Sequence, residues 1–107
     1  MPQVLTPDAA QLQALINDPA RLVLVNLTAA WCGPCKGMAP ALEAFALANK
    51  DSVVVAKIDI EQYPGISQRF MVRSVPTLVL LKDGEVQAVK VGALSLAALE
   101  QAFAARR

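Results

Sequence analysis

Two cysteines three residues apart constrain this chain more than any other feature. They are Cys32 and Cys35, in the run Trp-Cys-Gly-Pro-Cys-Lys at 31–36, and the chain has no other cysteine and no histidine. A nearly continuous apolar stretch at 22–28 precedes the run, and a helical pattern over about 38–48 follows it. The sequence therefore predicts a buried strand, a short turn and a helix, with Cys32 at the N-terminus of that helix.

This position predicts an unusual chemistry for Cys32. The N-terminus of a helix favours an anion, because its first backbone N–H groups lack partners and the helix dipole is positive there. A thiolate is such an anion, so we expect the pKa of the Cys32 thiol to lie below the ~8.5 of a free cysteine. Cys35 follows one turn later, within reach of the Cys32 sulfur, and Pro34 suits the first turn of a helix. We expect Cys32 to be exposed, Cys35 to be shielded, and the pair to open and close as a dithiol.

Other uses of a cysteine pair compete with redox chemistry. Free cysteine is often an inert core residue. A zinc site needs four ligands, or three and a water, and this chain cannot complete one without a third cysteine or a histidine. A cysteine protease needs an activating base such as histidine, which is absent. A C-x-x-C motif at a strand-to-helix turn favours redox chemistry, with no metal site.

Size and charge indicate one domain over residues 1–107 and exclude several partners. The 107 residues are 55% hydrophobic, and the formal net charge is +1. Charges of one sign form no block, so we expect neither nucleic-acid binding nor a membrane footprint. No basic region followed by an apolar segment begins the chain, and no apolar run has transmembrane length. We therefore expect a cytoplasmic protein, in a reducing compartment where a cysteine pair is usually catalytic.

The remaining pattern predicts an α/β fold in the order β-α-β-α-β-α-β-β-α. Asp8 and Gln11 have capping-box spacing, and Lys-Asp-Gly at 82–84 signals a hairpin turn. Helices are expected at 8–16, about 38–48 after the motif, 61–70 with an interruption at 63–65, and 95–105, the last capped by Ser95 and carrying Leu96, Leu99 and Phe103. Strands are expected at 3–5, 22–27, 53–59, 77–81 and 86–91. They make a mixed five-stranded sheet with a terminal antiparallel hairpin and helices on both faces.

The motif at 31–36 is that of the thioredoxin family, and nearly the whole chain resembles this family. The resemblance extends to Pro40, Lys57-Ile58-Asp59, Val75-Pro76-Thr77, Lys82-Asp83-Gly84 and Val91-Gly92-Ala93. It implies a thioredoxin fold and a protein-disulfide reductase working by thiol–disulfide exchange. In that reaction Cys32 is the nucleophile and Cys35 resolves the mixed disulfide.

The resemblance also assigns roles around the dithiol. It implies a cis peptide before Pro76, and places the backbone of Val75 where an extended substrate strand can pair with it. Trp31 adjoins the nucleophile and is expected to cover the active site, and Lys36 completes the motif. A small apolar docking patch would consist of Trp31, Gly33, Pro34, Val75, Pro76, Gly92 and Ala93.

Asn26 is the main departure from the family pattern. Thioredoxins usually carry an aspartate six residues before the first cysteine, and a second tryptophan where this chain has Thr28. Asn26 cannot accept a proton from Cys35, and it carries no negative charge that could pair with Lys57. Lys57 is either a solvated strand end or the remaining half of the family's ion pair. The departure bears on proton transfer and on turnover, and leaves the dithiol chemistry intact.

The implied partners are disulfide-containing proteins and a thioredoxin reductase that depends on flavin and NADPH. The chain has no nucleotide-binding loop, and we expect no cofactor of its own and a monomer serving electron transport and cell redox homeostasis. Two alternatives stay open. One is a thioredoxin-like binding module, or a specialised paralogue with slow turnover. The other is an oxidase or isomerase of an oxidising compartment, against which the N-terminal sequence argues.

Overall fold

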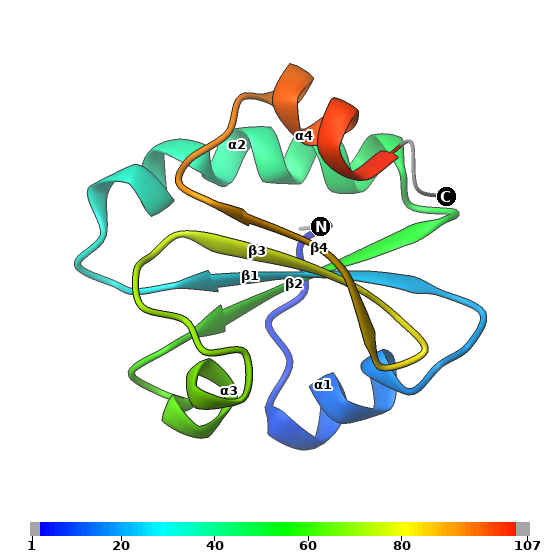
Figure 1. Cartoon of the computed structure of the whole chain (residues 1–107). Helices are drawn as coiled ribbons and strands as arrows, with labels where there is room; N and C mark the ends of the chain where they lie inside the picture. The colour runs from blue at the N-terminus through cyan, green and yellow to red at the C-terminus, as the bar shows by residue number, and fades with distance from the viewer. Residues whose placement is uncertain (1–2, 105–107) are drawn as a thin grey trace.

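A four-stranded mixed sheet with two helices on each face makes up the computed structural model, which describes residues 3–104 (Figure 1). The elements in chain order are α1 (Ala9–Ile16), β1 (Leu22–Thr28), α2 (Gly33–Ala48), β2 (Val53–Asp59), α3 (Pro64–Arg69), β3 (Thr77–Lys82), β4 (Glu85–Val91) and α4 (Leu96–Phe103). Figure 1 shows α2 and α4 over one face of the sheet and α1 and α3 over the other. Within residues 3–104, no helix combines the length and apolar character needed to cross a bilayer.

The strand order is β2-β1-β3-β4, so β1 and β3 are central. β1 runs parallel to β2 and antiparallel to β3, and β3 and β4 form the antiparallel hairpin that the sequence predicts. Asp83 and Gly84 have φ of 50° and 80° at its turn. Two successive positive φ angles are what a two-residue Asp-Gly hairpin turn requires.

The predicted fifth strand at 3–5 is wrong in this structure. Only Leu5 pairs there, in an isolated parallel bridge to Ala56 of β2. The N–H groups of Gln3 and Val4 are bonded instead to the Glu43 carboxylate on α2, at 2.7 and 3.1 Å. The chain then passes through Pro7, which has no N–H to donate. The Glu43 carboxylate therefore takes two N–H groups that a strand would use, and Pro7 has none to offer. Only the single bridge at Leu5 remains of the expected strand.

Alternation along β1 determines which residues face which helices. Leu22 and Leu24 belong to the core under α2 and α4, whereas Val23 and Val25 belong to the core under α1 and α3. Successive side chains of a strand point to opposite faces. Asn26 therefore shares the face of Leu24 and is directed toward α2.

Side-chain caps determine where α1 and α4 begin. The Asp8–Gln11 capping box is formed, and Ser95 accepts the Ala98 N–H at the start of α4. α3 is shorter than the predicted 61–70, because the Asp59 carboxylate accepts the N–H groups of residues 61 and 62 in a turn before the helix.

The predicted apolar stripe of the last helix is partly wrong. Leu99 and Phe103 are fully buried, but Leu96 is 40% exposed. Leu96 is the first residue after the Ser95 cap, and it does not belong to the core cluster that contains Leu99 and Phe103. The end predicted at Ala105 lies outside the described residues.

Candidate active site

The strand–turn–helix unit places the two cysteines next to each other at the start of α2. They form a disulfide, with their Cα atoms 5.3 Å apart. Cys32 is the N-cap of the helix, and its sulfur accepts the N–H of Cys35 at 3.1 Å. Pro34 occupies the first turn, and the helix continues through Pro40. This is the local structure that the sequence predicts.

The expected exposure of Cys32 is wrong for this oxidised form. Cys32 is 3% exposed and Cys35 is 5% exposed, so the two sulfurs are shielded to similar extents. Ala29, Ile60 and Val75 pack around them. Ile60 and Val75 come from parts of the chain that no local pattern connects with Cys32.

What distinguishes the two sulfurs is electrostatic. The Cys32 sulfur lies at a helix N-terminus and accepts a backbone N–H. Both features stabilise a negative charge on it once the disulfide is reduced. Cys35 lies inside the first turn, at the wall of a cavity described below.

Val75 and Pro76 lie beside the disulfide. Their peptide bond is cis, as the resemblance implies, and the Val75 carbonyl oxygen is 3.8 Å from the Cys32 sulfur. A disulfide sulfur has no proton, so in this form the pair is a contact, whereas a Cys32 thiol can donate to the carbonyl. Gly92 donates its N–H to the Pro76 carbonyl at 2.9 Å, with φ of 101°, a conformation suited to glycine. Ala93 follows on the surface.

Trp31 lies on the surface at the other border of the dithiol. Its side chain is 67% exposed, and its indole Nε1 donates to the Glu61 carboxylate at 2.6 Å. The sequence reasoning did not identify Glu61. Glu61 follows the end of β2 by two residues, and β2 is parallel to β1, so both strands end at the edge of the sheet where the motif begins. This position could have indicated that Glu61 lies near Trp31. Gly33, Pro34 and Lys36 are also exposed.

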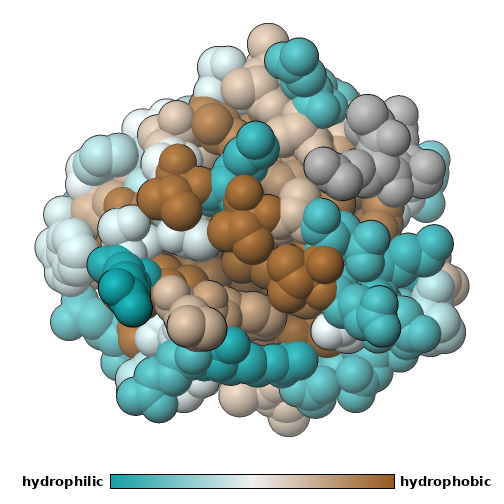
Figure 2. All heavy atoms as spheres, viewed as in Figure 1, coloured by the Kyte–Doolittle hydropathy of each residue, from teal (hydrophilic) through white to brown (hydrophobic). Residues whose placement is uncertain are grey.

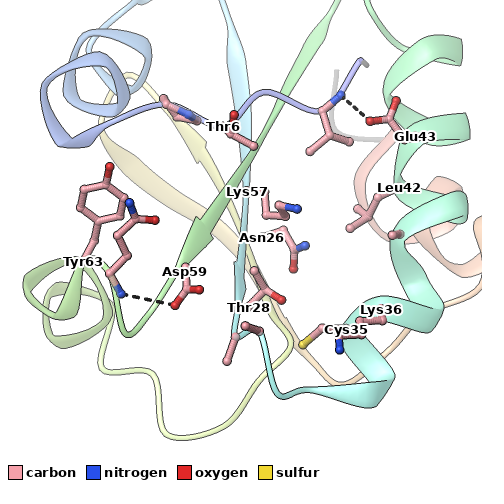
Figure 3. Close-up of a pocket in the computed structure, with 16 residues that line it drawn as sticks. Thr6, Asn26, Thr28, Cys35, Lys36, Leu42, Glu43, Lys57, Asp59 and Tyr63 are labelled. Atoms are coloured by element: carbon pink, nitrogen blue, oxygen red, sulfur yellow. Dashed lines mark hydrogen bonds between the residues drawn. The ribbon is translucent and has the colours of Figure 1, made fainter. Parts of the chain in front are cut away.

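A cavity of about 780 Å³ adjoins Cys35 on the α2 side of the sheet (Figure 3). We call it the back cavity. Segments from β1, β2, α2, the N-terminal stretch and the loop after β2 enclose it, with polar side chains from Thr6, Asn26, Thr28, Lys36, Glu43, Lys57, Asp59, Gln62 and Tyr63. The Glu43 carboxylate, by holding Gln3 and Val4, keeps the N-terminal stretch at one wall.

Asn26 and Lys57 are register partners on β1 and β2, and both line the back cavity. Asn26 is 2% exposed, and its Oδ1 is buried without a hydrogen-bond partner among the described residues. Within that same part of the chain the one ion pair joins Arg21 to Asp18, so Lys57 pairs with no carboxylate there. The position behind the dithiol thus carries an amide and an unpaired lysine.

Comparison with known proteins gives a consistent result. The thioredoxin family model matches residues 3–105. The chain is 51% identical over 70 residues to a thioredoxin from Rhodospirillum rubrum, covering 65% of this chain and 67% of that protein. It is 48% identical over 77 residues to one from Alicyclobacillus acidocaldarius, covering 72% and 71%.

A solved structure agrees with these sequence matches. The matched structure comes from a study of the thiol resolving mechanism of yeast mitochondrial 1-Cys peroxiredoxin via the glutathione and thioredoxin systems. It superimposes with a TM-score of 0.80 at 31% identity, covering 92% of this chain and 91% of the other. With its dithiol at the start of α2, the chain thus belongs to the thioredoxin family and is a dithiol–disulfide oxidoreductase that reduces protein disulfides.

Proposed function

We propose that Cys32 is the attacking sulfur and Cys35 the resolving sulfur of this reductase. The observation that carries the assignment is the position of Cys32 as N-cap of α2, with the Cys35 N–H on its sulfur. A thiolate at Cys32 is stabilised by both features, and the thiolate is the nucleophile in disulfide exchange. Cys35 lies in the first turn of the helix, where its sulfur can attack the Cys32 sulfur of a mixed disulfide.

The reaction then runs in two exchanges. The Cys32 thiolate attacks one sulfur of a substrate disulfide, forming a mixed disulfide and releasing the other sulfur as a thiolate. Cys35 attacks the Cys32 sulfur, and its proton passes to the substrate thiolate released in the first exchange. The second substrate sulfur leaves, and the Cys32–Cys35 disulfide forms. Two electrons pass from the dithiol to the substrate.

The substrate docks on the surface around the dithiol. Val75, half-buried and next to the Cys32 sulfur, offers backbone groups to an extended substrate segment. The rest of the docking surface comes from Trp31, Gly33, Pro34, Gly92 and Ala93, whereas Pro76, which the resemblance also places in the docking patch, is buried next to Val75. The hydrogen bond between Gly92 and the Pro76 carbonyl, and that between Trp31 and Glu61, support two borders of this surface.

In the cell, a flavin- and NADPH-dependent thioredoxin reductase returns the disulfide to the dithiol. The chain works as a single thioredoxin domain and as a monomer, carrying electrons in the cytoplasm for redox homeostasis without nucleic-acid or membrane partners. Its near-neutral formal charge of +1 and its family membership support this reading.

The experiment is reduction of a protein disulfide with NADPH and a thioredoxin reductase. The parent chain should turn over, Cys35→Ser should accumulate a mixed disulfide on Cys32, and Cys32→Ser should do neither. Retained turnover in Cys32→Ser, or a mixed disulfide on Cys35 in that variant, would reverse the assigned roles.

A binding module is the second candidate, and an exposed apolar strand favours it. Val86, Val89 and Val91 of β4 are 52%, 51% and 65% exposed. Figure 2 has the same view as Figure 1 and shows hydrophobic residues gathered on the face where β4 lies. β4 is an edge of the sheet, and edges can pair with other chains. A Cys32→Ser, Cys35→Ser double variant separates the candidates, because a binding module keeps its cellular role and a reductase loses it.

A further inference from the structure

An unpartnered amide oxygen belongs to a residue that lines the same cavity as Cys35. Asn26 Oδ1 has no hydrogen-bond partner within residues 3–104, although the residue is 98% removed from solvent. Leaving a buried acceptor unsatisfied destabilises the folded state. Native structures contain few such groups, and each requires an explanation.

Asn26 faces the end of the molecule where Cys35 lies. It is on the α2 side of β1, and Cys35 is in the first turn of α2. Both residues line the back cavity. Figure 3 shows the Asn26 amide oxygen directed along this cavity toward the Cys35 end and away from Lys57. Among the residues that the structure describes, no charged side chain donates a hydrogen bond to this oxygen.

Reduction changes the hydrogen-bonding capacity of Cys35. The disulfide has no proton to donate, whereas a thiol is a donor. When two molecules of glutathione reduce the Cys32–Cys35 bond, glutathione disulfide forms and two electrons and two protons pass to the cysteine sulfurs. A donor thus appears at Cys35, at the cavity that contains the unpartnered oxygen.

We propose that Asn26 is a redox-linked positioning residue, which accepts a hydrogen bond directly from the Cys35 thiol in the reduced form. The bond exists only after reduction, so it stabilises the dithiol relative to the disulfide. It also holds the Cys35 proton on the side away from the substrate. The inference rests on the proposed function, because it requires that Cys35 is the protonated sulfur of the reduced protein before substrate binds.

The proposal predicts the sign of a change in redox equilibrium. Asn26→Leu has a similar volume and no acceptor, so it removes the bond from the reduced form and the unpartnered oxygen from the oxidised form. Both effects make the disulfide harder to reduce. We expect the equilibrium constant for reduction by glutathione to fall about tenfold, which corresponds to a potential more negative by ~30 mV. Asn26→Val serves as a second variant with a smaller side chain suited to a strand.

A second measurement must agree with the first. The free-energy change that corresponds to the shift in potential equals the difference between the effects of the substitution on the unfolding free energies of the oxidised and reduced forms, because the four states form a closed cycle. Denaturant melts of both forms should therefore show that Asn26→Leu stabilises the oxidised form relative to the reduced form by that same free energy.

Asn49 provides a matched control. It is also a buried asparagine, 3% exposed, and its Nδ2 donates to the Phe45 carbonyl and to Glu100, both at 2.9 Å. It caps the far end of α2, about 20 Å from Cys35 along a helix of 1.5 Å rise per residue. Asn49→Leu should destabilise both redox forms equally and leave the glutathione equilibrium unchanged.

The outcomes are distinct. An equilibrium constant that falls in Asn26→Leu and Asn26→Val but not in Asn49→Leu supports the proposal. An unchanged or increased constant in both Asn26 variants overturns it, and the Cys35 proton is then held by another acceptor such as Cys32. The equilibrium needs no reductase or protein substrate, so a parent chain that equilibrates with glutathione yet fails to turn over contradicts the proposed function alone.

Discussion

At the scale of single residues, position 26 distinguishes this chain most clearly from the family pattern. Asn26 is buried at the register position of Lys57, with one wall of the back cavity beside it. An amide there needs no proton and carries no charge. The chain thereby avoids the desolvation of a buried carboxylate, and leaves the Cys35 proton without a carboxylate to receive it.

Restoring the carboxylate should exchange stability for a faster resolving step. Burial raises the pKa of an aspartate in place of Asn26, because desolvation disfavours its charged form. The penalty is absent below the unfolded pKa of about 4, grows as pH rises, and levels off above the folded pKa. Denaturant melts should show that Asn26→Asp loses roughly 1 to 3 kcal/mol more at pH 8 than at pH 5. Single-turnover resolution of a mixed disulfide should be faster than in the parent.

The same exchange at an exposed site is the control for this prediction. Asn17 is exposed at the end of α1, so Asn17→Asp should show little pH dependence of stability between pH 5 and pH 8. If Asn26→Asp behaves like Asn17→Asp and resolves no faster, position 26 does not communicate with Cys35.

The two sulfurs should differ in reactivity although they are equally buried when oxidised. The backbone N–H on its sulfur and the helix N-terminus favour a thiolate at Cys32. Brief, sub-stoichiometric alkylation of the reduced protein near neutral pH, followed by mass mapping, should find the label predominantly on Cys32. Predominant labelling of Cys35 would mean that accessibility, rather than charge stabilisation, governs the reaction.

At the scale of elements, the apolar stripe of α4 predicts more buried residues than the structure contains. Leu96 and Leu99 are both on the predicted stripe, yet one is 40% exposed and the other is fully buried. Phe103, one turn after Leu99, packs edge-on against Phe45 of α2 with ring centroids 6.5 Å apart. The contact between α2 and α4 thus depends on the later turns of α4.

The same substitution at these two leucines should have unequal effects. Leu99→Ala removes fully buried methyl groups and leaves a cavity, which typically costs about 2 to 5 kcal/mol. Leu96→Ala removes a partly exposed side chain and should cost well under half of that, since exposed area contributes little. Urea denaturation of the two variants, in one redox state, measures the difference. Equal losses would show that the first turn of α4 is packed as firmly as the second.

At the scale of the whole molecule, segments distant in the sequence converge around the active site. Val75, Gly92 and Glu61 belong to three different loops, and each contacts the active-site region through a defined interaction. The sheet order places the ends of β1 and β3 side by side, which brings these loops together. A docking surface formed in this way should affect large substrates more than small ones.

Trp31 provides the test of that distinction. Its side chain is mostly exposed, so Trp31→Ala should change stability little. Tryptophan is frequent among residues that dominate binding energy at interfaces, so kcat/KM for a protein disulfide should fall about tenfold or more. Reduction of a small disulfide should be nearly unchanged. Leu47→Ala, at another apolar residue that is 55% exposed, should alter neither rate.

The sequence by itself determined the local structures. The strand–turn–helix unit, the N-cap position of Cys32, the Asp8–Gln11 capping box and the Asp83–Gly84 turn all follow from interactions between residues within a few positions of each other. Apolar and β-branched runs, together with the spacing around the Asp-Gly turn, likewise predicted β1 through β4 to within one residue at each end. Such features can be read from neighbouring residues because the hydrogen bonds that define them span three or four positions.

Only the tertiary structure decided the features that join distant residues. Glu43 takes the N–H groups of Gln3 and Val4 across about forty positions and so removes the expected first strand. Ile60 and Val75 cover Cys32, and Glu61 holds Trp31 across thirty positions. The unpartnered oxygen of Asn26 depends on what α2 and β2 place around it. No local pattern encodes these contacts, since each depends on how separate elements pack.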